Sequence, residues 1–216
     1  SVFLPEDPKA SMVKKLGGLL SSLSSRFKLY AVVGGGKISR YYINLGRILG
    51  LDEHQLDEMG IEVTRLNARL LSAAIGRKAN PCPAENIEEA VRASKKYPIL
   101  VMGGTTPGHT TDAVAAMLAE RVKAARLVNA TSVDGIYTSD PKKHRGARRI
   151  EKMGYRELIN LSKGYKDYAG PSIVFDHMGA TIITSSQIPL FVVDGRDLKN
   201  LKAAIEGRRF HGTVVE

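Results

Sequence analysis

The chain has 216 residues, of which 43% are hydrophobic and 25% charged, a composition typical of a folded globular protein and not of a disordered chain. No apolar run approaches the roughly 20 residues that a membrane-spanning helix needs, so we expect no association with a membrane. The net charge of +10 is compatible with a nucleic acid or a small polyanion as partner.

The pattern of apolar residues alternates between helical and extended segments along the whole chain. Spacings of i, i+3 and i+4 predict helices, and short apolar runs predict strands. The first half is expected to contain a helix over 9–25, a strand over 29–33, helices over about 38–49 and 57–75, a strand over 99–102 and a helix over about 114–122. The second half is expected to contain a strand over 125–130, a turn-rich segment over 132–147, helices near 154–162 and over about 173–186, a strand over 190–193, a helix over about 197–206 and a strand over 213–215.

This alternation predicts the fold class. Strands separated by helices favour the α/β class, here a three-layer α/β/α sandwich with an open, mostly parallel sheet. No internal repeat, low-complexity tract or long linker interrupts the pattern, so we expect a single domain over residues 1–216.

Three glycines, 34–36, follow the strand over 29–33, at the carboxyl end where open parallel sheets bind ligands. Glycine lets backbone N–H groups converge on an oxyanion, and the next helix directs its positive end at the same place. Lys37 and Arg40 are expected in its first turn, where the helix dipole disfavours cations, so their position favours an anion between them. The alternative is a tight strand–helix turn with two exposed bases. The segment is not the dinucleotide-binding fingerprint G-x-G-x-x-G, because Ser39 stands at the position of its last glycine.

A second candidate loop, GGTTPGHTT, occupies residues 103–111. Its spacing is nearly that of the phosphate-binding loop G-x-x-x-x-G-K-[ST], but His109 stands where that loop has its lysine. Hydroxyl groups and the amides of a helix N-terminus are neutral donors, which suit a phosphate that must keep its charge to attack. The loop is therefore predicted to bind an acceptor phosphate and not the triphosphate of ATP. His109 is either a donor or a surface residue.

The third candidate loop is TSVDGIYTSDP at 131–141, where Asp134–Gly135 and Asp140–Pro141 are turn signals. Tyr137 lies between these turns and could flank an adenine ring. An ordinary surface hairpin is the alternative.

Other residue types exclude several classes of site. The only cysteine, Cys82, excludes an intrachain disulfide and suits a reducing cytosol. The five histidines lack the paired spacing of zinc ligands, so we expect no structural or catalytic zinc. The eight Tyr and five Phe do not interleave with the basic run KKHRGARR at 142–149. This run therefore favours a solvated face that attracts small polyanions over a nucleic-acid surface.

Five segments carry a family resemblance that runs almost from end to end. They are VVGGGKISR (32–40), MGIEVTRLNARLL (59–71), VMGGTTPGHTTDAVAA (101–116), TSVDGIYTSDPKK (131–143) and GTVVE (212–216). Together they resemble the archaeal-type UMP kinases of the amino acid kinase family. The combination of GGTTPGHTTDA with VDGIYTSDP is highly specific, whereas the triple glycine alone is not.

The resemblance implies transfer of the γ-phosphate of MgATP to UMP, which gives UDP. It implies an acceptor-nucleotide lobe over about 1–124 and an ATP lobe over about 125–216. The residues implied in catalysis are Lys37, Arg40 and Asp176. Those implied in binding UMP are Gly35, Asp57, Thr105, Thr106, Pro107, Gly108, His109, Thr110 and Thr111. Those implied in binding ATP are Ser1, Gly36, Arg40, Thr131, Ser132, Tyr137 and Asp140.

Two positions depart from the family pattern. Ser132 stands where the family usually has Asn, and FDHMGA around Asp176 is a loose version of its motif.

In the family, the serine at the position of Ser1 closes a strand that ends in Gly-Gly-Ser. We therefore expect one strand and two glycines before Ser1, with Ser1 in contact with Gly35 or Gly36.

The implied chemistry needs no general base, because a nucleotide phosphate with a second pKa of about 6 is largely ionised near neutral pH. Catalysis would rest on in-line positioning and on cancelling the repulsion between two anions. Mg²⁺ is expected to arrive with ATP and to take few or no protein ligands, so no residue is assigned to a metal. The resemblance also implies a homohexamer.

Three alternatives stay open on the residues alone. The nearest is a sister kinase with another acceptor, such as isopentenyl phosphate, carbamate or acetylglutamate. The second is a non-catalytic nucleotide-binding protein of the same fold, and the third is a basic RNA-binding protein.

Overall fold

The computed structural model describes residues 10–139, 144–163 and 175–216. The chain forms two compact units, with one boundary between Val114 and Ala115, and each unit is described by itself. The predictions that rest on Ser1 and Asp140 lie outside the described residues. Within the described ranges, no helix combines the length and the apolar composition that a membrane crossing needs.

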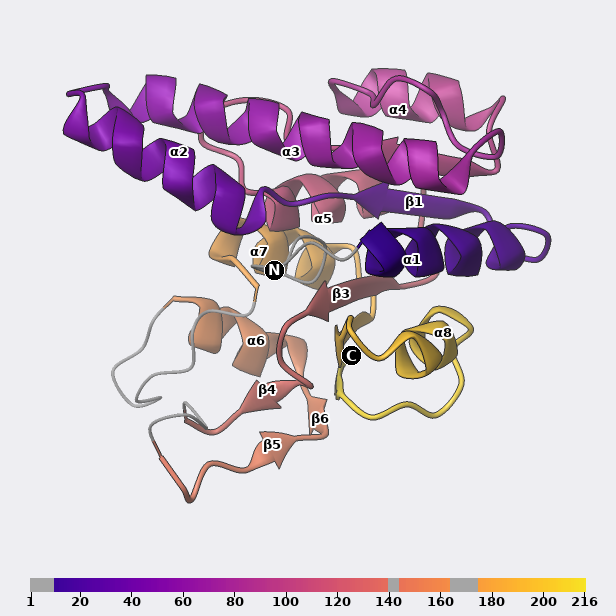
Figure 1. The fold of residues 1–216 in the computed structure, drawn as a ribbon. Coiled ribbons are helices and arrows are strands. Elements are labelled where there is room, and N and C mark those ends of the chain that lie inside the picture. The colour runs from indigo at the N-terminus through magenta and orange to yellow at the C-terminus, as the bar shows by residue number, and fades with distance from the viewer. Residues whose placement is uncertain (1–9, 140–143, 164–174) are drawn as a thin grey trace. The chain divides into compact units, whose positions relative to one another are not determined.

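The first unit consists mainly of helices around two paired strands (Figure 1). Its elements are α1 (Ala10–Leu23), β1 (Leu29–Val32), α2 (Gly36–Ile48), α3 (Glu53–Ile75), α4 (Ile87–Ser94), β2 (Ile99–Met102) and the start of α5 (Thr111–Arg121). Strands β1 and β2 are parallel, with Leu29 opposite Ile99 and Val32 opposite Met102. The loops that follow the two strands therefore leave the same edge of the sheet.

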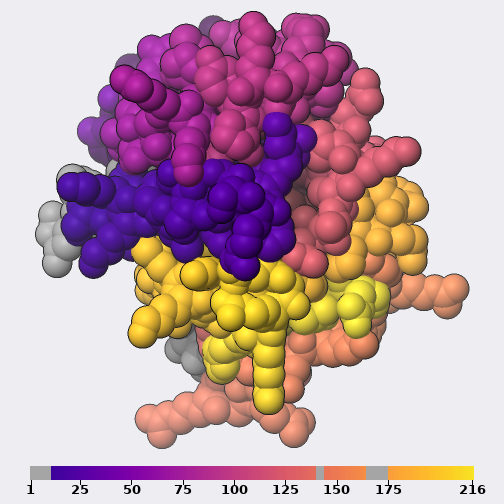
Figure 2. Space-filling model, turned by 90° about the vertical axis from the view of Figure 1, so that its right-hand side faces the viewer, coloured from indigo at the N-terminus to yellow at the C-terminus, as the bar shows by residue number. Residues whose placement is uncertain are grey.

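Helix α3 is the packing centre of the first unit. Helices α1 and α2 both pack against it, and the fully buried strand β2 also contacts it. Helix α1 lies along the surface of this unit, in indigo in Figure 2. A Cβ added at Gly17 would lie 2.7 Å from the carbonyl oxygen of Ala74, so α1 and α3 approach closely because this residue has no side chain.

The side chain of the buried Asn80 pairs with the backbone of β2 on the side of this strand that faces away from β1. Its side-chain oxygen accepts a hydrogen bond from the Val101 N–H at 2.7 Å, and its amide donates to the Val101 carbonyl at 2.8 Å. Isolated bridges pair Ala79 with Ile99 and Ala84 with Met102 on this side. The backbone of β2 is thereby held on both sides.

The second unit contains most of the strands. Its elements after α5 are β3 (Leu127–Thr131), β4 (Ile136–Tyr137), β5 (Arg149–Ile150), β6 (Lys152–Met153), α6 (Tyr155–Ser162), α7 (His177–Ser185), β7 (Leu190–Asp194), α8 (Leu198–Ile205) and β8 (Thr213–Val215). The main sheet has the order β3-β7-β8-β6, with β3–β7 and β6–β8 parallel and β7–β8 antiparallel. Strands β4 and β5 form a separate antiparallel pair. The core between sheet and helices includes the buried Leu158, Ile183 and Leu190.

Most of the predicted elements are present near their predicted bounds, and three of the five strand pairings found among the described residues are parallel. Helix α3 begins at Glu53, earlier than predicted, because Asp52 and Gln55 form a capping box that adds its first turn. Helix α4 and the short strand β6 were not predicted. The segment predicted as turns contains β4, which pairs with the unpredicted β5.

Candidate functional site

The glycine loop, residues 34–36, connects β1 to α2. Helix α2 begins at Gly36, whose φ is +64°, and Gly35 is its N-cap without a capping side chain. Lys37 is therefore the second residue of α2 and Arg40 the fifth, and both side chains are exposed. The uncapped start of α2 and two exposed cations lie where the sequence predicts an anion.

Helix α3 holds the glycine loop through the side chain of Asn67. The Asn67 amide donates to the carbonyl oxygen of Gly34 at 2.9 Å and to that of Gly35 at 3.3 Å. Asn67 is only 4% exposed, and the two hydrogen bonds offset the cost of burying its amide. A Cβ added at Gly35 would lie 2.2 Å from the Cβ of Ser39, so only glycine fits at this position.

The acceptor loop, residues 103–111, is fixed at its first residues by the same helix. The Gly104 N–H donates to Thr64 Oγ1 at 2.6 Å, and this hydroxyl donates to the Ile61 carbonyl at 2.6 Å. The Arg65 guanidinium donates to the carbonyl oxygens of Gly104 at 3.3 Å and of Thr105 at 3.2 Å. These contacts anchor the base of the acceptor loop on α3.

The tip of the acceptor loop is held by Asp57. Its Oδ2 accepts the Gly108 N–H at 2.7 Å, and Gly108 has a φ of +84°, which favours glycine. Thr106 Oγ1 and His109 Nδ1 lie 3.1 Å apart, so this histidine contacts a loop hydroxyl. At the end of the loop, Thr110 Oγ1 accepts the Ala113 N–H at 3.1 Å and caps α5.

The two loops of the first unit lie next to each other. A Cβ added at Gly34 would lie 3.4 Å from Thr111 Oγ1, at the start of α5. The first unit thus brings together three groups of predicted site residues: 34–36, Asp57 and 105–111. Their donors are backbone amides and hydroxyl groups, with two cations on α2.

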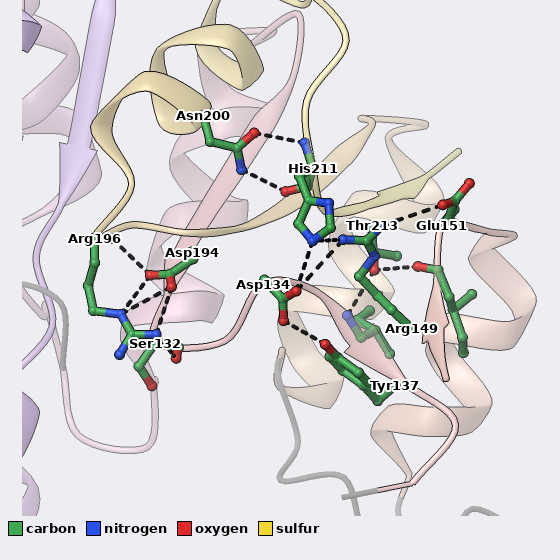
Figure 3. A network of polar contacts seen from close by, with 12 residues as sticks. Ser132, Asp134, Tyr137, Arg149, Glu151, Asp194, Arg196, Asn200, His211 and Thr213 are labelled. Carbon is green, nitrogen blue, oxygen red and sulfur yellow. Dashed lines mark hydrogen bonds and ion pairs between the residues drawn. The ribbon is translucent and has the colours of Figure 1, made fainter. Parts of the chain in front are cut away.

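In the second unit, the predicted ATP residues Thr131 and Ser132 are tied to β7. The Thr131 carbonyl accepts the Gly195 N–H at 2.9 Å. Arg196 donates to the Ser132 carbonyl at 3.0 Å and forms an ion pair with Asp194 at 2.7 Å (Figure 3). The hydrogen bonds from Arg196 hold the pKa of the Asp194 carboxyl below its usual value, although partial burial opposes this.

Tyr137 belongs to a polar network around Asp134 (Figure 3). The Tyr137 hydroxyl donates to Asp134 Oδ1 at 2.8 Å, while His211 Nε2 lies 3.0 Å from Oδ2 and Arg149 lies 3.7 Å from it. Burial raises the pKa of the Asp134 carboxyl, but the hydrogen bonds with Tyr137 and His211 outweigh it and hold this pKa below the usual value. The neighbouring Asp134 carboxylate in turn raises the pKa of the Tyr137 hydroxyl. The network fixes the segment between β3 and β4.

Asp176, predicted as a catalytic carboxylate, is the N-cap of α7. Its Oδ1 accepts the N–H groups of Met178 at 2.8 Å and of Gly179 at 3.1 Å. The cap fixes the orientation of the carboxylate at the start of α7, and the catalytic role stays a prediction.

Comparison with known proteins identifies the family. A profile described as the amino acid kinase family matches residues 4–194. The chain belongs to the amino acid kinase family. It is 47% identical to the uridylate kinase of Methanoculleus marisnigri, over 100% of this chain and 92% of the relative, and 44% identical to that of Methanospirillum hungatei, over 100% and 91%.

A solved structure of this kinase family supports the fold. The crystal structure of uridylate kinase from Archaeoglobus fulgidus matches with a TM-score of 0.88 and 38% identity, over 97% of this chain and 94% of that one. The predicted α/β class with an open, mostly parallel sheet is confirmed. The resemblance on which the family prediction rested is confirmed as well.

Sequence reasoning missed the residues that hold the loops of this kinase. In the first unit these are Thr64, Arg65 and Asn67. The segment that contains them had been noticed only as part of the family resemblance. The sequence did carry a signal for them: polar residues occur on the face of α3 that its apolar pattern marks as buried. Such residues need hydrogen-bond partners, which indicates a contact with another part of the chain.

Proposed function

We propose that this chain is a cytoplasmic UMP kinase that transfers the γ-phosphate of MgATP to UMP, a step of pyrimidine nucleotide synthesis. The observation that carries the proposal is the pair of adjacent loops at the ends of β1 and β2, fixed by α3. The names of relatives that match over the whole chain support the same reaction.

The acceptor loop is proposed to hold UMP. Thr105 to Thr111 would bind the base and phosphate through hydroxyl and amide groups, and Gly35 would contact the same nucleotide. Neutral donors orient the phosphate without removing the charge on the oxygen that attacks. Asp57 would bind the uridine, which requires its hydrogen bond with Gly108 to be shared or exchanged.

By the family resemblance, the residues proposed to bind ATP include Gly36, Arg40, Thr131, Ser132 and Tyr137. Lys37 and Arg40 would neutralise charge on the transferred phosphoryl group, which spreads over its oxygens in the transition state. Asp176 would organise the cations around the phosphates. The proposed roles of Ser1 and Asp140 in ATP binding rest on the resemblance alone.

Mg²⁺ is proposed to enter bound to ATP. Across the described ranges, no group of three histidine, cysteine or acidic side chains is arranged to hold a metal ion. The donor groups of the glycine loop instead suit phosphate oxygens, which are themselves the usual ligands of Mg²⁺ in kinase sites. Mg²⁺ would supply charge neutralisation between the two phosphate groups.

A coupled assay of ADP release tests the proposed function. The purified chain is given MgATP with UMP, CMP, dUMP or isopentenyl phosphate in turn. The expected result is turnover with UMP at a kcat/KM well above that of the other acceptors. Preferred turnover of isopentenyl phosphate would identify a sister kinase, and nucleotide binding without turnover would identify a non-catalytic relative.

We also propose a homo-oligomer, for which α2 supplies the physical reason. Tyr41, Ile48 and Leu49 on and just after α2 are 61%, 81% and 78% exposed, and Leu66 and Leu70 of α3 are exposed as well. Large exposed apolar side chains on two helices that pack against each other are typical of an interaction surface. We expect Ile48→Glu to reduce the mass of the assembly measured by light scattering, and an unchanged mass would contradict the role of this surface. The homohexamer remains an expectation from the resemblance.

A further inference from the structure

We propose that Asn67 is a positioning residue for the proposed reaction, because it sets the direction in which the glycine loop presents its N–H groups. Asn67 lies within α3 and is not proposed to touch either nucleotide. The inference rests on the proposed function.

The geometry at Asn67 leads directly to this role. One amide group donates two hydrogen bonds, to the carbonyl oxygens of Gly34 and Gly35. In a planar trans peptide, the C=O of one residue and the N–H of the next point in opposite directions. Because α3 holds the carbonyl oxygens of Gly34 and Gly35, the N–H groups of Gly35 and Gly36 point away from α3.

The loop and α2 fix only part of this orientation. The Gly35 carbonyl also accepts the Ser39 N–H at 3.2 Å, whereas the Gly34 carbonyl is held by Asn67. Glycine has the least conformational restriction of any residue, so three in succession give a loop with many accessible backbone directions. Phosphate binding by backbone amides requires that several N–H groups converge on one place. An external hydrogen-bond donor that fixes two successive carbonyl groups removes the alternatives in which the amides turn inward.

The acceptor loop is held by α3 in the same way, through hydrogen bonds between side chains of the helix and the loop backbone. Thr64 accepts the Gly104 N–H, and Arg65 donates to the carbonyl oxygens of Gly104 and Thr105. Asn67 is 4% exposed, so it is held in place by packing and its amide has little freedom to release the glycine loop.

The test uses Asn67→Asp, which keeps the shape of the side chain but removes the N–H donor. At about pH 8 an ionised carboxylate would face two carbonyl oxygens, and we expect kcat/KM to fall about 10²-fold, the scale of a misplacement by roughly 1 Å. Burial and the carbonyl oxygens raise the pKa of the introduced carboxyl. Its protonated form can donate an O–H, so the deficit relative to wild type at the same pH should shrink towards about pH 5.5.

Two further variants separate positioning from folding. Asn67→Ala also loses the donor but cannot titrate, so its deficit relative to wild type should not depend on pH. Ser72→Ala is the matched control, because Ser72 lies on the same helix, is 4% exposed and has a buried hydroxyl with no hydrogen-bond partner among the described residues. This control should keep wild-type kinetics and melting temperature.

The outcomes are distinguishable from those for the proposed function. Binding of a fluorescent ATP analogue, measured for every variant, does not require turnover, and it should weaken in Asn67→Asp with the same pH dependence. Wild-type binding and kinetics in Asn67→Asp would overturn the inference, as would a deficit equal to that of Asn67→Ala at every pH. A wild-type chain that binds ATP but does not phosphorylate UMP would refute the proposed function alone.

Discussion

Gly35→Ala tests the site most directly, because the structure gives the size of the perturbation. The φ and ψ of Gly35, −77° and −27°, are accessible to alanine, so the effect is steric and not conformational. The new Cβ would lie 2.2 Å from the Cβ of Ser39, whereas two carbon atoms normally approach to roughly 3.5 Å. The start of α2 must therefore move by about 1 Å, which shifts the loop amides and Lys37 together.

Two magnitudes follow from this displacement. Overpacking of this kind typically costs about 1–3 kcal/mol of stability. At roughly 2–4 °C per kcal/mol for a chain of this size, the loss is measurable as a lower melting temperature. A shift of about 1 Å in groups that orient a phosphate is expected to lower kcat/KM with UMP and MgATP by about 10²-fold.

A double-mutant cycle and a control complete the design. Ser39→Gly removes the colliding Cβ, so the pair Gly35→Ala with Ser39→Gly should be more active than Gly35→Ala alone. Gly18→Ala in α1 is the control, because an added Cβ there meets nothing within 4 Å. It should leave kinetics unchanged and, as a helix-interior change, stabilise by up to about 1 kcal/mol. If Gly35→Ala keeps the melting temperature and kcat/KM of wild type, the steric reasoning is wrong.

Three other predictions concern single side chains. Lys37→Ala and Arg40→Ala should each lower kcat about 10²-fold or more with little change in melting temperature, because each removes an exposed donor of transition-state charge, and wild-type turnover would contradict the assignment. Asp57→Asn should mainly raise KM for UMP. A raised KM for ATP with an unchanged KM for UMP would contradict the assignment of Asp57 to the UMP subsite. Asp194→Asn should be less stable than wild type at neutral pH. The pKa of Asp194 is lowered by the Arg196 hydrogen bonds, so its contribution to stability is present above the ordinary value of 3.8 and is lost as the pH falls through the lower folded value. The difference in melting temperature should therefore shrink below about pH 4 and persist above it; a constant difference would rule out this linkage.

The part of the fold that could be predicted followed from the spacing of apolar residues and from the glycines that end the strands. The apolar runs of β1 and β2, followed by glycines, gave both strands and both loops of the first unit. Helix α4 was missed although Asn86 caps it by accepting the Glu89 N–H at 2.8 Å, because only eight residues follow the cap. Its signal was local and could have been found.

The contacts that hold the site were not predictable in the same way. Asn67 reaches Gly34 across 33 positions of sequence, and Asn80 reaches Val101 across 21. Hydrophobic period shows which face of a helix is buried, but not which distant backbone group a polar side chain on that face will meet. A single sequence therefore indicates that such a residue needs a partner without naming the partner.

The burial of polar residues in α3 has a consequence for how the site works. Thr64 and Asn67 are 6% and 4% exposed, and burying polar groups is unfavourable unless they are hydrogen-bonded. Their partners are the backbones of the two loops, so the folded core and the loop conformations stabilise each other. The contacts at the bases of both loops are made within the protein itself, which limits the ordering cost of nucleotide binding there. The tip of the acceptor loop differs, because its contact between Asp57 and Gly108 is exposed. Selection among acceptor nucleotides should therefore depend mainly on the tip, and phosphate positioning on the residues that α3 holds.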